Sequence, residues 1–376
     1  EPKGVMISNQ NLVKQCEMLQ NLLGDKPRST LVSWLPNFHD MGLVLGLVQS
    51  IFQGCKTVFM SPEAFIRNPL NWLKLMDHCK ADYSVVPNFA LDLCVKHATS
   101  EAIADLDLSS ISRIGVSAEP VRASTLNSFL DTFAPTGIKP EALTPSYGLA
   151  EATLVVAGKQ GGKPIKTLAF ETAAIKQGNA VECALDESDA RQLVGHGKVL
   201  DSYDVQIVDP NTLTVCENGR VGEIWVSQGS VGQGYWNNPE LTKQDFGATI
   251  KGQNKPYMRT GDFGFIYKDE FFISGRLKDL IIINGNNHHA NDLEETVKQC
   301  SAELFDFGAV FSVDTNDVEQ VVVLQELDRK LYKQQTPEVL SALADKVLQQ
   351  LSEHHEIAVS TLVFYPKNLP RTTSGK

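Results

Sequence analysis

The N-terminal part of the chain alternates between segments with helical spacing of apolar residues and short extended apolar runs. The helical segments are residues 9–23, 41–52, 70–79 and 91–99. The extended runs are residues 30–35, 56–60, 82–86 and 111–116. Asp40 precedes the second helical segment and can accept hydrogen bonds from its first free amides. A βαβα order of this kind places parallel strands in one sheet with helices on its faces, so we predict an α/β fold.

The alternation of helical and extended segments ends near Gly195, after which Gly, Pro and Asn turns separate short β-like runs. These runs, at residues 205–208, 222–226 and 271–274, indicate a small β-rich unit. Beyond the turn signal Asn284-Gly285, helical and extended segments follow at residues 292–300, 306–313, 318–324 and 337–353. We therefore predict an α/β part of a large domain at residues 1–194, a β-rich subdomain at 195–277 and a small α+β domain at 278–376.

Residues 158–191 fit neither pattern. They begin with a Gly- and Lys-rich stretch and continue with weakly periodic, partly acidic sequence. Long stretches of this kind are usually functional or linking, so we expect an inserted lobe or a flexible excursion. The chain begins with Glu1 instead of Met and stops abruptly at Lys376, so we expect it to be a segment of a longer protein.

Composition places the chain among ordinary globular proteins and argues against some partners. Its 376 residues are 42% apolar and 21% charged, with a net charge of −11. That charge argues against a nucleic-acid partner, because phosphate backbones require basic stripes. The longest apolar run, residues 42–52, is too short to span a bilayer. We therefore expect no transmembrane segment, and the N-terminus has no signal-peptide pattern.

Cysteines and histidines give no sign of a metal site. The seven cysteines form no Cys-x-x-Cys pair, which indicates reduced thiols and a cytoplasmic protein. A catalytic cysteine is the less favoured alternative, since none lies in a Gly-rich or His-flanked setting. The pairs His288-His289 and His354-His355 are adjacent in sequence, so their side chains point in different directions. We expect neither pair to bind a metal.

Polar motifs follow several of the predicted strands, and each has two readings. His39 and Asp40 stand at a strand-to-helix junction, where open α/β sheets bind ligands, but spacing alone slightly favours a helix cap and a buried histidine. Glu151 follows Tyr147-Gly148 and could hold Mg²⁺ between phosphates, or could be an ordinary acid in a first helical turn. Lys3, in Pro-Lys-Gly, is by itself typical of a surface turn.

Two further motifs lie in the second half of the chain. Asp262 and Arg276 flank a hairpin-like strand and could grip a sugar diol, since a carboxylate accepts from hydroxyls and a guanidinium donates to them. A surface ion pair is the plainer alternative. The segment at residues 370–376 is polar and typical of a disordered terminus when read alone.

The order of these motifs is more specific than any one of them. In chain order they are Pro-Lys-Gly at residue 2, Trp-Leu-Pro-x-x-His-Asp-Met-Gly from Trp34, Ser-Tyr-Gly-Leu-Ala-Glu-Ala-Thr from Ser146, Gly-Glu-Ile-Trp from Gly222 with Gly-Tyr-Trp from Gly234, Arg-Thr-Gly-Asp from Arg259, Gly-Arg-x-Lys-Asp from Gly275 and a terminal Ser-Gly-Lys. Across essentially the whole chain, this series resembles the adenylate-forming superfamily of acyl-CoA synthetases, peptide-synthetase adenylation domains and luciferases.

Within that superfamily the chain looks like a fatty acyl-AMP ligase, on residues 39–42, on residues 147–154 and on the long interval 153–195. CoA-forming relatives cross this interval more briefly. The resemblance implies a small mobile C-terminal domain and an insertion that hinders the rotation that would admit CoA. The acyl group then passes to an acyl carrier protein or a polyketide-synthase carrier domain.

The resemblance also implies roles for single residues. Lys376 is the mobile catalytic lysine, Glu151 holds magnesium, and His39 lies beside the carboxylate at the mouth of an acyl tunnel. Lys278 and Asp279 form the hinge between domains. The residues expected to contact ATP or AMP are Lys3, Gly4, Ser117, Ala118, Glu119, Pro120, Ser146, Tyr147, Gly148, Leu149, Ala150, Asp262 and Arg276.

The implied reaction uses ATP and Mg²⁺ to convert a medium- or long-chain fatty acid into fatty acyl-AMP and pyrophosphate. The carboxylate attacks the α-phosphorus, and charge builds on phosphate oxygens, so the site must supply cations aimed at them. No general base is required, because a carboxylic acid is already ionised at pH 7.

The sequence departs from the family pattern at three places. The Ser/Thr-Gly half of the phosphate loop does not precede Glu1, Ala150 replaces a Thr common in the superfamily, and residues 284–290 differ from the Arg-Gly-Arg-Asn-His-Tyr-Pro common in the branch.

Three other functions remain open. They are a fatty acyl-CoA synthetase, an amino-acid adenylation domain with an acid near Asp40 for the substrate ammonium, and a non-catalytic nucleotide- or lipid-binding relative.

Overall fold

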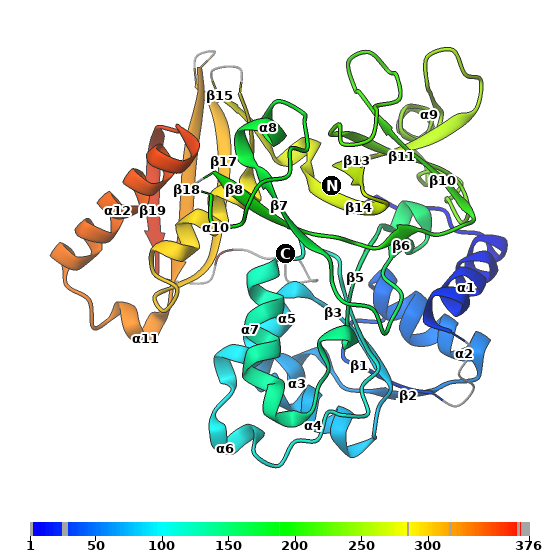
Figure 1. The fold of residues 1–376 in the computed structure, drawn as a ribbon, viewed down its shortest axis with the longest axis horizontal. Helices are drawn as coiled ribbons and strands as arrows, with labels where there is room; N and C mark the ends of the chain where they lie inside the picture. The colour runs from blue at the N-terminus through cyan, green and yellow to red at the C-terminus, as the bar shows by residue number, and fades with distance from the viewer. Residues whose placement is uncertain are drawn as a thin grey trace.

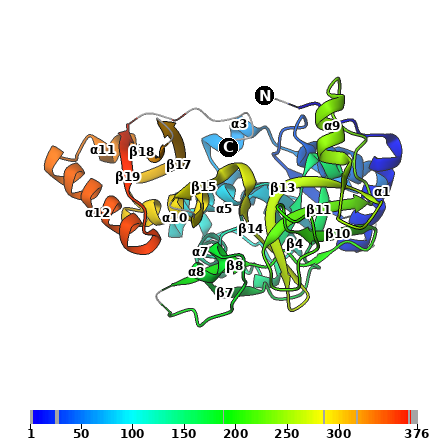
Figure 2. The ribbon, with the colours of Figure 1, turned by 90° about the horizontal axis from the view of Figure 1, so that it is seen from above.

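The computed structural model describes residues 3–24, 29–187, 189–283, 286–315, 318–366 and 369. Helix α1 lies at one end of the long axis of the molecule, and α12 with strands β17–β19 lies at the other (Figures 1 and 2). Within the described residues, no helix is both long and apolar enough to cross a membrane. The seven cysteines are free thiols.

A seven-stranded sheet forms the centre of the described N-terminal part. Its strands are parallel from β2 to β5, and β6 and β9 continue the sheet antiparallel at one edge. In spatial order the strands are β2 (Lys56–Phe59), β1 (Thr30–Ser33), β3 (Tyr83–Pro87), β4 (Arg113–Ser117), β5 (Leu143–Gly148), β6 (Val155–Gly158) and β9 (Lys198–Val199). The predicted parallel α/β arrangement is thus confirmed.

Helices cover both faces of this sheet. Figure 1 shows α5 and α7 together on one side and α1 and α2 on the other. Trp72, Phe129 and Phe133 are fully buried in the core that they enclose. The helices are α1 (Asn9–Leu23), η1 (Met41–Gln49), α2 (Ser50–Gln53), α3 (Pro62–Arg67), α4 (Leu70–His78), α5 (Asn88–His97), α6 (Ser100–Ile103), α7 (Ala123–Phe133) and the single turns η2 (Ala134–Thr136), η3 (Pro140–Ala142) and η4 (Ala150–Ala152).

The second part is an antiparallel sheet with one helix. Strands follow the order β10, β11, β13 and β12, and β14 pairs with the other end of β13. The bounds are β10 (Tyr203–Val208), β11 (Gly222–Gln228), α9 (Pro239–Phe246), β12 (Ala248–Thr249), β13 (Pro256–Tyr267) and β14 (Glu270–Arg276).

The segment predicted as a lobe or a flexible excursion is a folded lobe. It contains the antiparallel pair β7 (Thr167–Glu171) and β8 (Ala190–Val194), with α8 (Thr172–Lys176) between them. Phe170 packs edge-on against Phe265 and Phe272 of the β-rich sheet, with ring centroids 5.2 and 5.4 Å away. The lobe therefore has a small apolar core in common with that sheet.

The C-terminal part has an apolar core of its own, made by residues between Ile281 and Ile357. A turn of 3₁₀ helix, η5 (Leu277–Asp279), precedes it and lies where the hinge is predicted. The other bounds are β15 (Leu280–Ile283), β16 (Asn286–His289), α10 (Ala290–Cys300), β17 (Phe305–Thr315), β18 (Val318–Leu327), α11 (Arg329–Tyr332), α12 (Pro337–His355) and β19 (Val359–Tyr365). The domain boundaries themselves stay predictions.

Two of the elements that differ from what the sequence predicts carry residues of the predicted motifs. The segment predicted as one helix over residues 41–52 is a π-helix over Met41–Gln49 continued by α2. Gly42 lets this helix start against Pro36, since a Cβ there would lie 2.2 Å from the Pro36 carbonyl oxygen. Strand β13 has 12 residues and was not predicted, because the polar run at its centre interrupts the alternation of a strand.

Candidate active site

Asp262 and Arg276 stand directly opposite each other on β13 and β14. The Arg276 Nε donates to Asp262 Oδ1 at 2.7 Å, and the Tyr147 hydroxyl donates to Asp262 Oδ2 at 2.7 Å. Asp262 is buried, and its negative charge is the largest cause of the raised pKa of Arg276. Burial raises the pKa of Tyr147, so its hydroxyl stays a donor. Two side chains, from β5 and β14, thus hold one carboxylate in a fixed position.

Glu151 is held in a similar way by Tyr235. Glu151 lies on the turn η4 after β5, and the Tyr235 hydroxyl donates to its Oε1 at 2.8 Å. Burial, followed by the charge of Glu151, raises the pKa of Tyr235. The Lys3 Nζ lies 4.6 Å from the centroid of the Tyr235 ring and 3.7 Å from Asp245 Oδ2. Tyr235 therefore connects the predicted phosphate segment to the predicted magnesium ligand.

The backbone around β4 and β5 is unusually constrained. Ala118, directly after β4, has a φ of 72°, which non-glycine residues rarely adopt and which often marks a binding site. The Ser117 hydroxyl donates to the Ser146 carbonyl at 2.9 Å and ties the two strand ends together. A Cβ on Gly148 would lie 1.8 Å from the Leu154 carbonyl oxygen, so only glycine fits there. Glu119 accepts from the Phe89 amide at 2.5 Å.

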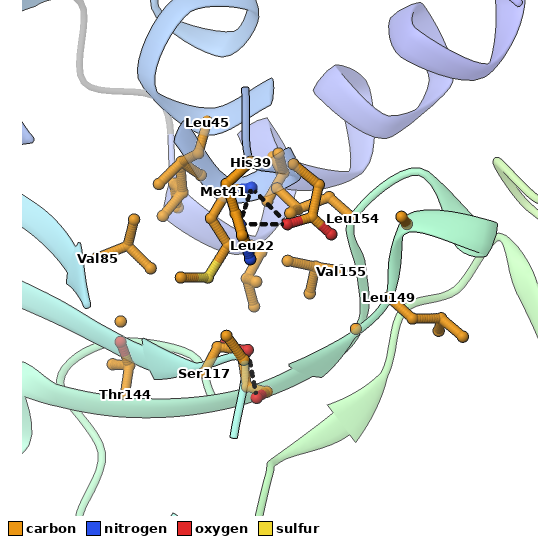
Figure 3. A pocket seen from close by; sticks show the side chains of 18 of the residues that line it. Leu22, His39, Met41, Leu45, Val85, Ser117, Thr144, Leu149, Leu154 and Val155 are labelled. Atoms are coloured by element: carbon orange, nitrogen blue, oxygen red, sulfur yellow. Dashed lines mark hydrogen bonds and ion pairs between the residues drawn. The ribbon is translucent and has the colours of Figure 1, made fainter. Parts of the chain in front are cut away.

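An apolar cavity of about 210 Å³ lies beside these strand ends. Figure 3 shows Leu22, Met41, Val85 and Val155 around its open centre. His39 lies at its edge, where its Nδ1 is 2.7 Å from Asp40 Oδ1. The Asp40 carboxylate also accepts from the Met41 amide at 2.7 Å, as predicted for a helix cap.

The cavity opens into a wide cleft. His39, Ser117, Ala118, Ser146, Gly148 and Arg276 line both. Glu119, Pro120, Tyr147, Asp262 and Asp279 line the cleft alone, whereas Leu149, Ala150 and Glu151 line the cavity alone. The structure thus brings together most of the residues predicted to contact nucleotide, next to an apolar cavity.

Some predicted residues lie away from the cavity and the cleft, or outside the described residues. Lys3 and Gly4 line neither the cavity nor the cleft. The Lys3 ammonium lies against the Tyr235 ring, and the Gly4 carbonyl accepts from the Trp236 amide at 2.7 Å. Lys278 is part of the turn η5. Lys376 and the turn Asn284-Gly285 lie outside the described residues.

Sequence reasoning missed three contributors. Tyr235 belongs to the motif Gly-Tyr-Trp, whose pattern indicates no role for the tyrosine hydroxyl. Arg113 and Lys159 line the apolar cavity and were not singled out. No local pattern marks these two cations, because only the tertiary fold directs them to an apolar cavity.

Comparison with known proteins gives the class to which this fold and this cluster of residues belong. The AMP-binding enzyme family matches residues 1–236, and a Disco-interacting protein 2-like AMP domain matches residues 278–376. The chain belongs to the AMP-binding enzyme family.

The names of individual relatives indicate a narrower group than the family does. The chain is 38% identical to the medium-chain-fatty-acid–[acyl-carrier-protein] ligase JamA of Moorena producens and 36% identical to the long-chain-fatty-acid–AMP ligase FadD26 of Mycobacterium marinum. In each case the match covers 100% of this chain, but 64% and 66% of the relative. A fatty acyl-adenylate ligase of L. pneumophila, solved with acyl adenylate and pyrophosphate, matches with 36% identity and a TM-score of 0.74, over 99% of this chain and 65% of that one. These relatives confirm the predicted resemblance to fatty acyl-AMP ligases.

Proposed function

We propose that the full-length protein activates a medium- or long-chain fatty acid with ATP and Mg²⁺ to give fatty acyl-AMP and pyrophosphate. A carboxylate oxygen of the fatty acid forms a bond to the α-phosphorus, and the bond from that phosphorus to the bridging oxygen of pyrophosphate breaks. The acyl group then passes to an acyl carrier protein. The observation that carries this proposal is that the cluster of Glu151, Asp262 and Arg276 borders the mouth of an apolar cavity.

Each part of the site has a task in this reaction. The Asp262 carboxylate can accept from ribose hydroxyls, because Tyr147 and Arg276 hold it in place. The apolar cavity can bury the acyl chain, which is worth about 0.8 kcal/mol per methylene. His39 lies at the edge of the cavity, where the carboxylate of the fatty acid would meet the nucleotide.

Glu151 suits a magnesium ion that also binds phosphate. In the described part of the chain, no group of three or more His, Cys, Asp or Glu side chains is arranged to hold a metal. Magnesium needs only one or two carboxylates when phosphate oxygens complete its shell. When bound, the ion would neutralise charge on the leaving pyrophosphate. Tyr235 holds the Glu151 carboxylate in position for it.

The relatives and the lobe support the proposed acceptor. The name of JamA specifies an acyl carrier protein. The lobe at residues 158–191 contacts the C-terminal part directly, since Arg191 Nη2 lies 2.8 Å from Asp292 Oδ1. This contact supports the expectation that the lobe limits the rotation that would admit CoA.

The experiment is pyrophosphate release by the full-length protein with dodecanoic acid, with amino acids and with no acid, followed by product analysis with CoA and with an acyl carrier protein. We expect release with the fatty acid and transfer to the carrier. Release with amino acids alone, or a CoA thioester as main product, would favour the other adenylating enzymes instead.

Changing Lys376→Ala tests the predicted catalytic lysine. We expect the rate of adenylate formation to fall by about 10²–10³, because one cation aimed at the transition state is lost. The affinity for ATP, measured by calorimetry, should hardly change. Lys139→Ala, at an exposed lysine that lines neither the cavity nor the cleft, is the matched control and should keep full activity. Normal turnover in the Lys376 variant would refute the assignment.

A further inference from the structure

The apolar cavity runs along the parallel strands, from their carboxyl ends towards their amino ends. Ser117 ends β4 at the mouth, and Arg113, the first residue of β4, also lines the cavity. Four steps of about 3.3 Å separate the two residues, so the cavity extends roughly 13 Å from the mouth. Tyr83, the first residue of β3, lines the same end. We call Tyr83, Arg113 and Lys159 the floor of the cavity.

Two cations line this floor. Lys159 is 6% exposed, and its Nζ donates to the carbonyls of Glu141 and Leu143 at 3.3 and 3.2 Å. The Arg113 Nη1 donates to the Leu22 carbonyl at 2.9 Å. Over the part of the chain that the structure describes, neither side chain forms an ion pair with a carboxylate. Lys159 is a buried charge and Arg113 a half-buried one, and such charges are costly unless something pairs with them.

The carbonyl contacts do not explain why these residues are charged. Backbone carbonyls need a donor and not a net charge, and a neutral side chain would serve them without the cost of burying an ion. Each cation also keeps spare donors, since an ammonium has three and a guanidinium five. An apolar cavity that ends in two cations therefore matches a ligand with an apolar middle and an anionic end.

We propose that the floor binds a second carboxylate, so that the preferred substrates are medium-chain α,ω-dicarboxylic acids. This inference rests on the proposed activation of fatty acids at the mouth. One carboxylate would meet the α-phosphorus near His39, and the other would lie between Arg113 and Lys159. The three backbone bonds of an extended residue span 3.3–3.6 Å, or about 1.2 Å per bond, so roughly 13 Å corresponds to a chain of about ten to twelve carbons.

The test compares dodecanedioic acid with dodecanoic acid in pyrophosphate release by the full-length protein. We expect kcat/KM to favour the diacid by at least about tenfold. Lys159→Met keeps the length of the side chain and removes the charge. It should lower kcat/KM for the diacid by about 10- to 100-fold, the usual cost of losing a hydrogen bond to a charged group, and raise that for dodecanoic acid, because the floor then becomes more apolar. Lys198→Met, at an exposed lysine of β9, is the matched control.

Two further readouts separate this role from a structural one. If Lys159 only supported the two carbonyls, Lys159→Met would lower the Tm and reduce activity with both acids equally, and that result would overturn the proposal. Arg113→Met should show the same loss of diacid preference, so the proposal stays testable if one variant fails to fold. A preference for 12-hydroxydodecanoic acid over the diacid would also overturn it, because a neutral oxygen would then suffice.

The pH dependence gives an independent check. Burial, followed by the charge of Arg113, lowers the pKa of Lys159 to about 8, while Glu141 and Glu270 act in the opposite direction. The Glu270 carboxylate already accepts from the Gly197 amide at 2.6 Å. The preference for the diacid should therefore decline as the pH rises through about 8 and Lys159 loses its proton, and it should be flat in Lys159→Met. Failure of dodecanoic acid itself to react would instead refute the proposed function.

Discussion

At the scale of single residues, Tyr235 connects two groups that we propose act on the same phosphates. Its hydroxyl donates to Glu151, and its ring lies against the Lys3 ammonium. The backbone supports this contact, because Val5 and Tyr235 form an antiparallel bridge and the Met6 amide donates to the Gly234 carbonyl at 2.9 Å. Tyr235 is thus a positioning residue for the proposed magnesium ligand.

Changing Tyr235→Phe should raise the Mg²⁺ concentration needed for half-maximal activity by about tenfold. The ring and its contact with Lys3 remain, but Glu151 loses a hydrogen bond worth roughly 1.5–3 kcal/mol when it involves a charge. The measurement is pyrophosphate release titrated with Mg²⁺. Tyr257→Phe removes an equivalent bond, 2.8 Å long, to Asp204 away from the site and should leave the titration unchanged. Identical curves for both variants would contradict the role of Tyr235.

At the scale of elements, the lobe is tied to the rest of the molecule by both apolar and polar contacts. Phe170 packs on Phe265 and Phe272. Arg191 donates to the Ser274 carbonyl at 2.7 Å and pairs with Asp292 of α10. Burial raises the pKa of Asp292, and the charge of Arg191 opposes that shift. Deleting the whole lobe would expose two phenylalanines, so a single substitution is the cleaner test.

Changing Arg191→Met should increase CoA thioester formation roughly five- to tenfold, within the usual range of coupling between sites. The apolar core of the lobe stays intact, but the link to the C-terminal part is lost. Product analysis with equal CoA and carrier protein measures this. Asp292→Asn removes the same link from the other side and should act alike, whereas Arg220→Met changes an exposed arginine that contacts Asn179 and should not. If neither Arg191→Met nor Asp292→Asn changes the product, Arg191 does not restrict the rotation.

Sequence patterns predicted the elements in which apolar residues recur at regular spacing. They failed where a run of polar residues from a predicted functional motif interrupts that spacing. Helix α1 has the predicted bounds, since its apolar spacing is regular. Strand β13 carries the polar run Arg259–Asp262, and its pairing shifts between Phe263 and Gly264, so no alternation survives. Asp262 and Arg276 were predicted as partners because both belong to recognisable motifs. Lys159 could not be predicted, because its significance depends on strands that are distant in sequence.

At the scale of the whole molecule, ion pairs join the C-terminal part to α5 and α7. Lys96 lies 2.6 Å from Asp306, and Lys298 lies 3.4 Å from Asp92. A third pair joins the residue before α7 to α10. Such half-exposed pairs contribute about 0–1 kcal/mol each and weaken in salt, because the Debye length is only about 8 Å at 0.15 M. Together they bias the arrangement of the two parts without locking it.

The pair between Arg122 and Glu295, 3.2 Å apart, allows this bias to be measured. Arg122→Glu alone should loosen the arrangement at low salt, because it places two carboxylates together. Adding Glu295→Arg restores opposite charges and should restore the arrangement. Distances between spin labels on α6 and α12 report the change, and at about 0.5 M salt the single variant should match the unmodified protein, since screening removes the repulsion. A single variant that stays tightly docked at low salt would mean that apolar packing, and not charge, sets how the two parts meet.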